Sequence, residues 1–162
     1  MKIYCLNNKH LREFNYGYSP FREIVTAINC LLKDLSDRAT PIDELTLVRL
    51  ICQDGLRLYL LEVDRKIVGM GTLCVGPETL MKKEARIEDF VILEALRGRG
   101  LGMAFGQYLI KSAKEKKVTA IELTSRSCRV AANKLWERLG FQKIGAKVVS
   151  GREKNIYRLE LN

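Results

Sequence analysis

Two early segments of the chain carry apolar residues at helical spacing. Residues 21–35 place apolar side chains on one face of a predicted helix, at Ile24, Ala27, Ile28 and Leu31. A second helix is predicted over 42–52, because Pro41 stands at its entry and Asp54-Gly55 at its exit.

Shorter apolar runs, several of them alternating with polar residues, predict strands. These runs span residues 1–6, 58–63, 67–75, 85–93, 118–124, 141–149 and 156–161. Two further helices are predicted over 101–116 and 129–139. Strands cluster before residue 100 and alternate with helices after it, which predicts an α/β (α+β) fold with a mixed, mostly antiparallel central sheet and helices on both faces. No linker or repeat interrupts the pattern, so residues 1–162 are expected to form one domain.

Composition is ordinary for a globular protein, with 47% hydrophobic and 29% charged residues. No apolar run reaches the length of a membrane span and the first residues do not form a signal peptide, so a cytoplasmic protein without membrane contact is expected. The five cysteines are widely spaced and the only histidine is His10, so we expect buried reduced thiols and neither a disulfide framework nor a metal site. The net charge of +9 is spread along the chain, and no nucleic-acid partner is expected.

A glycine-rich segment, Arg97-Gly98-Arg99-Gly100-Leu101-Gly102, lies between the strand-like run 87–93 and a predicted helix. Glycines remove side chains that would keep an anion off the backbone, and the first turn of the helix offers unpaired N–H groups. The segment lacks the Lys-Ser/Thr of a P-loop, and Met103 stands where a dinucleotide-binding fingerprint needs glycine. It predicts a phosphate cradle, and by itself it is equally compatible with a flexible basic turn.

A second motif follows about 30 residues later, on the predicted helix 129–139. It consists of Arg129, Ala132, Trp136 and Leu139-Gly140-Phe141. Together the two motifs resemble the signatures of the GNAT superfamily of N-acetyltransferases, and the resemblance covers residue 56 to the C-terminus. It implies a GNAT-like fold, in which two parallel central strands splay apart to admit acetyl-CoA as cosubstrate.

The resemblance also implies roles for individual residues. The pyrophosphate of acetyl-CoA would be held by Arg97, Gly98, Arg99, Gly100, Leu101 and Gly102, and its pantetheine arm would pair with the main chain of Val91, Ile92 and Leu93. Trp136 would lie close to the cosubstrate. Asn133 either bonds the pantetheine amides or is a solvated polar residue. The acceptor pocket would be shaped by the first helices and by residues 76–83.

Two adjacent carboxylates, Glu88 and Asp89, interrupt the apolar run and are candidate catalytic bases. Because successive side chains of a strand alternate between faces, at most one faces the cleft unless a bulge intervenes. A lysine-type amine costs about 4.6 kcal/mol to deprotonate at pH 7 and an α-amine about 1.4 kcal/mol, so the need for a base depends on the acceptor.

Trp136 departs from the family pattern, since many relatives carry a tyrosine there that protonates the departing thiolate. Three possibilities follow: the thiolate leaves without a protein acid, Tyr157 supplies the proton, or the chain is an acyl-CoA-binding sensor or scaffold without activity. We expect an N-acetyltransferase that moves an acetyl group directly to a primary amine of a small molecule or peptide, as a monomer or homodimer.

Overall fold

The computed structural model describes residues 1–7 and 20–161, and His10 lies outside this part of the chain. Seven strands form one sheet: β1 (Lys2–Leu6), β2 (Leu56–Val63), β3 (Lys66–Val75), β4 (Glu84–Ile92), β5 (Ala120–Arg126), β6 (Gln142–Val149) and β7 (Arg152–Glu160). The helices are α2 (Pro20–Leu35), α3 (Glu44–Ile51), α4 (Leu101–Glu115) and α5 (Val130–Arg138), with a short 3-10 helix, η1 (Glu94–Leu96). The elements agree with those expected, except that β7 begins four residues before the apolar run 156–161.

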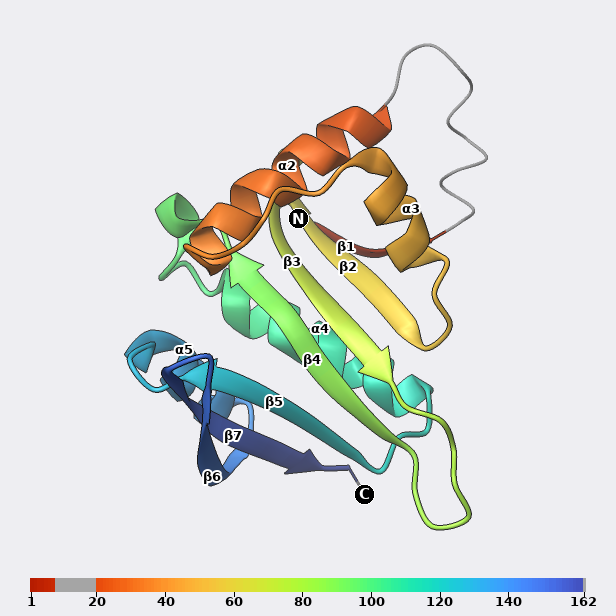
Figure 1. Ribbon diagram of the computed structural model, residues 1–162, viewed down its shortest axis with the longest axis vertical. Coiled ribbons are helices and arrows are strands. Elements are labelled where there is room, and N and C mark those ends of the chain that lie inside the picture. Colours follow the sequence, from red (N-terminus) through yellow and green to blue (C-terminus); the bar gives the residue numbers. More distant parts are fainter. Residues whose placement is uncertain (8–19, 162) are drawn as a thin grey trace.

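The strand order is β1-β2-β3-β4-β5-β7-β6, and every neighbouring pair is antiparallel except β4 and β5. Helices α2 and α3 cover one face of the β1–β4 half, while α4 crosses behind the sheet (Figure 1). The predicted fold class, a mostly antiparallel mixed sheet with helices on both faces, is confirmed.

Two apolar clusters hold these layers together. One lies under α4 and α5 and includes Ile87, Ile92, Phe105, Trp136 and Tyr157. The other lies under α2 and α3 and includes Leu31, Leu47, Leu60 and Val91. Along β5 and β7, most residues that alternate with those of the first cluster are polar, among them Glu122, Thr124, Lys154 and Arg158.

The parallel pair β4 and β5 separates partway along its length. The two strands pair only from Glu84 with Ala120 to Ile87 with Leu123. Beyond these residues they diverge, as Figure 1 shows at the upper ends of the two strands. A V-shaped opening therefore lies between the C-terminal halves of β4 and β5.

Arg158 on β7 stabilises the end of this opening at which β4 and β5 still pair. Its guanidinium donates to Glu84 of β4 at 2.9 Å, to Glu122 of β5 at 2.6 Å and to Glu160 at 2.5 Å. Hydrogen bonds from Arg158, and then from Lys82, lower the pKa of Glu84. One cation thus joins β4, β5 and β7 at the paired end of β4 and β5, before these two strands diverge.

We expect Arg158→Gln to lower the free energy of unfolding by about 2 kcal/mol, because charge-assisted hydrogen bonds are lost and three carboxylates remain close together. Urea denaturation at pH 7 measures the change. Arg138→Gln, on the exposed end of α5, is the control and should change stability by less than about 0.5 kcal/mol. Since the folded pKa of Glu84 is depressed, its contribution should disappear as the pH falls through that pKa. Equal stability of the two variants would contradict the stabilising role of Arg158.

The cysteines differ from expectation. Cys30, Cys52 and Cys128 are exposed, and Cys5 and Cys74 are partly buried, so none is a fully buried thiol. Apolar sequence neighbours misled the prediction, because in a helix or strand only one side of such a run faces the core. Within residues 1–7 and 20–161, no helix is long and apolar enough to cross a membrane.

Candidate active site

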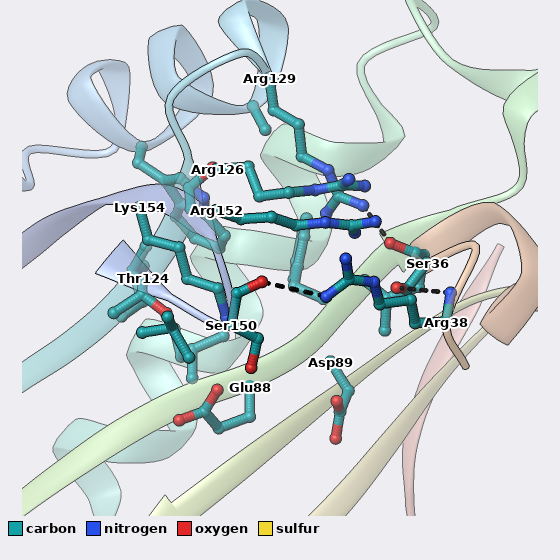
Figure 2. Close-up of a pocket in the computed structure, with 18 residues that line it drawn as sticks. Ser36, Arg38, Glu88, Asp89, Thr124, Arg126, Arg129, Ser150, Arg152 and Lys154 are labelled. Carbon is teal, nitrogen blue, oxygen red and sulfur yellow. Dashed lines mark hydrogen bonds between the residues drawn. The ribbon is translucent and has the colours of Figure 1, made fainter. Parts of the chain in front are cut away.

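A cavity of about 310 Å³ opens where β4 and β5 diverge. Its apolar lining includes Ile87, Phe90, Leu123 and Trp136. Its polar lining comes from β4, the connection after α2, the end of β5, the start of α5, and the β6–β7 hairpin (Figure 2). Residues 76–83, expected near the acceptor pocket, do not line it; they join β3 to β4 at the far end of these strands.

A β-bulge in β4 places both candidate bases on the cavity side. Glu88 pairs with Thr72 and Val91 with Met70, so β4 has one extra residue here, and Asp89 adopts a φ of 50°. Before the bulge Ile87 faces the α4 cluster, and after it Ile92 faces the same cluster, which reverses the odd–even alternation. Glu88 and Asp89 both line the cavity as a result.

The two carboxylates have different surroundings. Partial burial, and then the neighbouring charge of Asp89, raise the pKa of Glu88 above its ordinary value, while its side chain keeps 45% of its surface exposed. The Arg86 guanidinium lies 3.8 Å from the Glu88 carboxylate and is two-thirds exposed, so it compensates little. Asp89 accepts a hydrogen bond from the Thr72 hydroxyl at 3.3 Å, which fixes its orientation.

The glycine-rich segment forms an open loop ahead of α4. Gly98 and Gly100 have φ values of 77° and 79°, and a Cβ at either would meet no atom within 4 Å. Gly100 is the N-cap of α4, with no side-chain capping bond and no acidic residue in the first turn. The first helical bond runs from Ala104 to Gly100, so the preceding amides lack helical acceptors. This loop can therefore accept an anion.

Gly102 has a different local reason to be glycine. A Cβ there would lie 3.2 Å from the Leu135 side chain of α5. The residue thus lets α4 and α5 approach closely, and this packing role was missed in the sequence.

The two arginines of the loop are not equivalent. The Arg97 side chain donates from Nε to the Ile92 carbonyl at 3.0 Å, which ties the loop back to the end of β4. Arg99 is exposed and makes no hydrogen bond or ion pair with the described residues. Arg99 is therefore the arginine with an uncommitted charge.

The end of β4 has one strand neighbour. The Leu93 amide donates to Val68 of the β3 side at 2.8 Å. Because backbone groups alternate along a strand, the groups of Ile92 and Phe90 point away from β3 and toward the opening. The Leu93 amide is thus already paired.

Trp136 and Tyr157 lie on the α5 side of the sheet. Trp136 is buried edge-on against Phe90 at 4.8 Å and Phe141 at 5.4 Å between ring centroids, and it reaches the cavity. Tyr157 is 1% exposed, and its hydroxyl lies 3.4 Å from Glu137 of α5. Tyr157 does not line the cavity that contains Glu88 and Asp89.

Asn133 is buried, so of its two alternatives the solvated helix residue is excluded. Its amide nitrogen donates to the carbonyls of Arg126 at 3.2 Å and Ser127 at 3.0 Å. Its Oδ1 has no partner among the described residues. Asn133 therefore braces the β5–α5 connection.

Sequence reasoning missed the basic wall of the cavity. Arg38, Arg126, Arg152 and Lys154 line it together with Arg129, which was identified only as part of the second motif. Arg152 and Lys154 are two residues apart on one strand, a spacing that could have suggested a shared face. Arg38 follows α2 in an irregular connection, where no periodic signal exists.

Comparison with known proteins identifies the class to which this fold and site belong. Residues 27–141 match the family described as Acetyltransferase (GNAT) family, and the chain belongs to that family.

One curated relative is N-acetyltransferase 8B of Homo sapiens, 26% identical over 92 residues, which are 56% of this chain and 40% of that protein. The chain thus spans less than half the length of this relative. The crystal structure of a ribosomal-protein-alanine N-acetyltransferase from Brucella melitensis superposes with a TM-score of 0.75 at 15% identity, over 99% of this chain and 100% of the other. A proposed streptothricin acetyltransferase from Bacillus anthracis, in complex with acetyl coenzyme A, has a TM-score of 0.60 at 22% identity, over 70% and 68% of the chains.

Proposed function

We propose that the protein is an acetyl-CoA-dependent N-acetyltransferase that moves an acetyl group to a primary amine by direct attack. The observation that carries the proposal is the bulge in β4, which directs Glu88 and Asp89 into a cavity at the diverging strands. The anion-accepting loop begins shortly after the same strand. A base and a phosphate site thus flank one opening, as transfer from acetyl-CoA to an amine requires.

The residues present fit acetyl-CoA. Gly98 and Gly100 leave open space in front of the α4 N-terminus for a pyrophosphate, and Arg99 adds an uncommitted charge. The amide N–H of Ile92, facing away from β3, is available to the pantetheine arm, whereas the Ile92 carbonyl already accepts a hydrogen bond from Arg97. The acetyl-CoA complex of the Bacillus anthracis relative supports the same cosubstrate for this family member.

The reaction is a simple substitution at the thioester. Glu88, as carboxylate, removes a proton from the acceptor ammonium directly or through one water. The amine nitrogen then forms a bond to the carbonyl carbon, and the C–S bond breaks with its electron pair leaving on the sulfur of CoA. The nitrogen gives up its second proton to water, so that a neutral amide forms. Glu88 suits the role because its raised pKa strengthens it as a base. Asp89, held by Thr72, orients the acceptor and raises the basicity of Glu88.

Protonation of the departing thiolate requires little help, since a thiol pKa is about 8.5. Trp136 packs between aromatic rings and supplies no proton. Burial raises the pKa of Tyr157, and its hydroxyl points to Glu137 on α5. We therefore assign the proton to solvent and treat Tyr157 as a packing residue.

Tyr157→Phe should leave kcat within about threefold of the wild type, because a lost general acid would instead cost about 10²-fold or more. Steady-state release of CoA measures this. A loss in kcat of about 10²-fold or more, with unchanged acetyl-CoA affinity, would show that Tyr157 is the general acid.

Tryptophan at position 136, where many relatives carry a tyrosine that protonates the thiolate, also favours a second candidate function. This candidate is an acyl-CoA sensor without activity. A parallel thermal-shift experiment with acetyl-CoA, CoA and a short DNA duplex separates the classes. We expect acetyl-CoA and CoA to raise the melting temperature and the duplex to leave it unchanged. Release of CoA with a panel of amines then distinguishes enzyme from sensor, and stabilisation by the duplex alone would contradict both.

A further inference from the structure

The cavity wall opposite Glu88 and Asp89 is strongly basic. Arg38, Arg126, Arg129 and Arg152 direct their guanidinium groups into one space, although they come from the connection after α2, the end of β5, the start of α5, and β7 (Figure 2). Four separate segments thus supply like charges to one small volume. The two carboxylates lie on the other side of that space, on β4.

These guanidinium groups have too few anionic partners. Asp37 accepts both bonds of Arg152, at 2.8 and 2.6 Å, and lies 4.0 Å from Arg126. Arg38 donates to the Ser150 carbonyl at 3.0 Å, and Arg129 donates to the Leu35 carbonyl. Carbonyls fix the orientation of a guanidinium without neutralising it, so within residues 1–7 and 20–161 the four cations share one carboxylate.

Two of the cations, which share the single carboxylate of Asp37, are also largely shielded from water. The Arg126 and Arg152 side chains are only 27% and 25% exposed. Burial, and then the charges of Arg126, Arg97 and Arg152, lower the pKa of Arg129. An entering anion would relieve this repulsion through short charge-assisted hydrogen bonds.

The phosphates of acetyl-CoA already have a different place. The anion-accepting loop at residues 97–102 contributes nothing to the cavity lining. The basic wall instead shares its space with Glu88 and Asp89, where the acceptor amine must lie. At about 310 Å³, the cavity suits a small acceptor.

We infer that the acceptor is a small zwitterionic amine, whose carboxylate binds the arginine wall formed by Arg38, Arg126, Arg129 and Arg152 while its ammonium faces Glu88 and Asp89. This inference rests on the proposed function, because it takes the amine to be the acetyl acceptor. The separation of cations and anions in the cavity selects both the charge and the direction of the substrate. A neutral amine of the same size would leave the arginine wall uncompensated.

Matched pairs of amines test the inference. Each pair joins an amino acid with its amide, such as glycine with glycinamide and glutamine with glutamine α-amide, and aminomethylphosphonate tests whether a phosphonate replaces the carboxylate. The carboxylate-bearing member should have the higher kcat/KM, by about tenfold or more. Equal or faster acetylation of the amides would overturn the inference and leave the proposed function standing.

The variant Arg126→Gln tests whether the preference for carboxylate-bearing amines comes from the arginine wall. It should raise KM for the carboxylate-bearing amine by about tenfold, with KM for acetyl-CoA and kcat/KM for the neutral amide unchanged. Arg126→Lys, which keeps the charge and loses the fork of donors, should fall between, and Arg138→Gln on the exposed end of α5 should match the wild type. A rise confined to KM for acetyl-CoA would assign the arginines to the cosubstrate and overturn the inference.

Binding separates the two proposals if no amine is acetylated. Calorimetry in the presence of CoA should detect the amino acids and not their amides, and Arg126→Gln should abolish the difference. Selective binding without acetyl transfer would retain the zwitterion site and reject the enzyme. Binding that does not distinguish the members of each pair would overturn the zwitterion site.

Discussion

Glu88→Gln should lower kcat by about 10²- to 10⁴-fold with a lysine-type amine, the usual scale for a lost general base. The glutamine keeps the size and polarity of the side chain and cannot accept the proton. Acetyl-CoA affinity should be unchanged, because Glu88 lies on the cavity side and not in the loop at residues 97–102. Single-turnover acetylation with a saturating acceptor, together with calorimetry of acetyl-CoA, separates the two effects.

Asp89→Asn is the matched comparison on the same bulge. Removing its charge takes away the second cause of the raised Glu88 pKa, so that pKa should fall. A base is active only when ionised, and the acidic limb of the kcat profile should therefore move to lower pH in Asp89→Asn. Glu88→Gln should lose that limb. An unchanged rate in Glu88→Gln, with a large loss in Asp89→Asn, would show that Asp89 is the general base and that Glu88 is not.

Gly100→Val should weaken acetyl-CoA binding by at least about tenfold, or about 1.4 kcal/mol. Gly100 has a φ of 79°, which a β-branched residue adopts with strain, and the new side chain would enter the open space in front of the α4 N-terminus. CoA should be affected equally, since both ligands share the phosphates. Calorimetry measures both affinities.

Gly151→Val provides a control with the same backbone conformation. Gly151 has a φ of 73° in the β6–β7 turn and also has no neighbour within 4 Å of a Cβ. A comparable loss of stability in both variants, with weakened acetyl-CoA binding only in Gly100→Val, is expected. Unaltered acetyl-CoA affinity in a folded Gly100→Val protein would remove the loop from the cosubstrate site.

The parts of the site that follow each other in sequence were predictable. The loop at residues 97–102 and the helix that follows it are local features, since glycine spacing and helical periodicity need no long-range contact. The mixed, mostly antiparallel character of the sheet followed from the clustering of strands before residue 100 and their alternation with helices after it. Helix α5 was likewise evident from its apolar face, although the role of Asn133 in bracing β5 was not.

The alternation of apolar residues in the sequence already indicated the bulge in β4. Ile87 and Ile92 both face the α4 cluster, yet one is odd and the other even in number, and the change falls at the two carboxylates. Such a reversal within one apolar run indicates an inserted residue. At most one carboxylate was expected to face the cleft unless a bulge intervened. Because the bulge is present, both do.

The basic wall had no comparable signal. Arg38 and Arg152 are more than 100 residues apart and meet only because α2 ends beside the β6–β7 hairpin, where Arg152 pairs with Asp37. Lysines and arginines that look dispersed in the sequence thus converge in space. Long-range side-chain convergence of this kind depends on tertiary packing, which residue spacing does not encode.

The central claim, direct acetyl transfer to an amine, is tested most directly by following both products of one reaction. The protein is mixed with acetyl-CoA and a panel of amines, and mass spectrometry counts the acetylated amine while a thiol assay counts released CoA. We predict equal molar amounts of the two products with at least one amine, and no acetylated protein when the acceptor is omitted. Tight acetyl-CoA binding without an acetylated amine from any member of the panel would contradict the account.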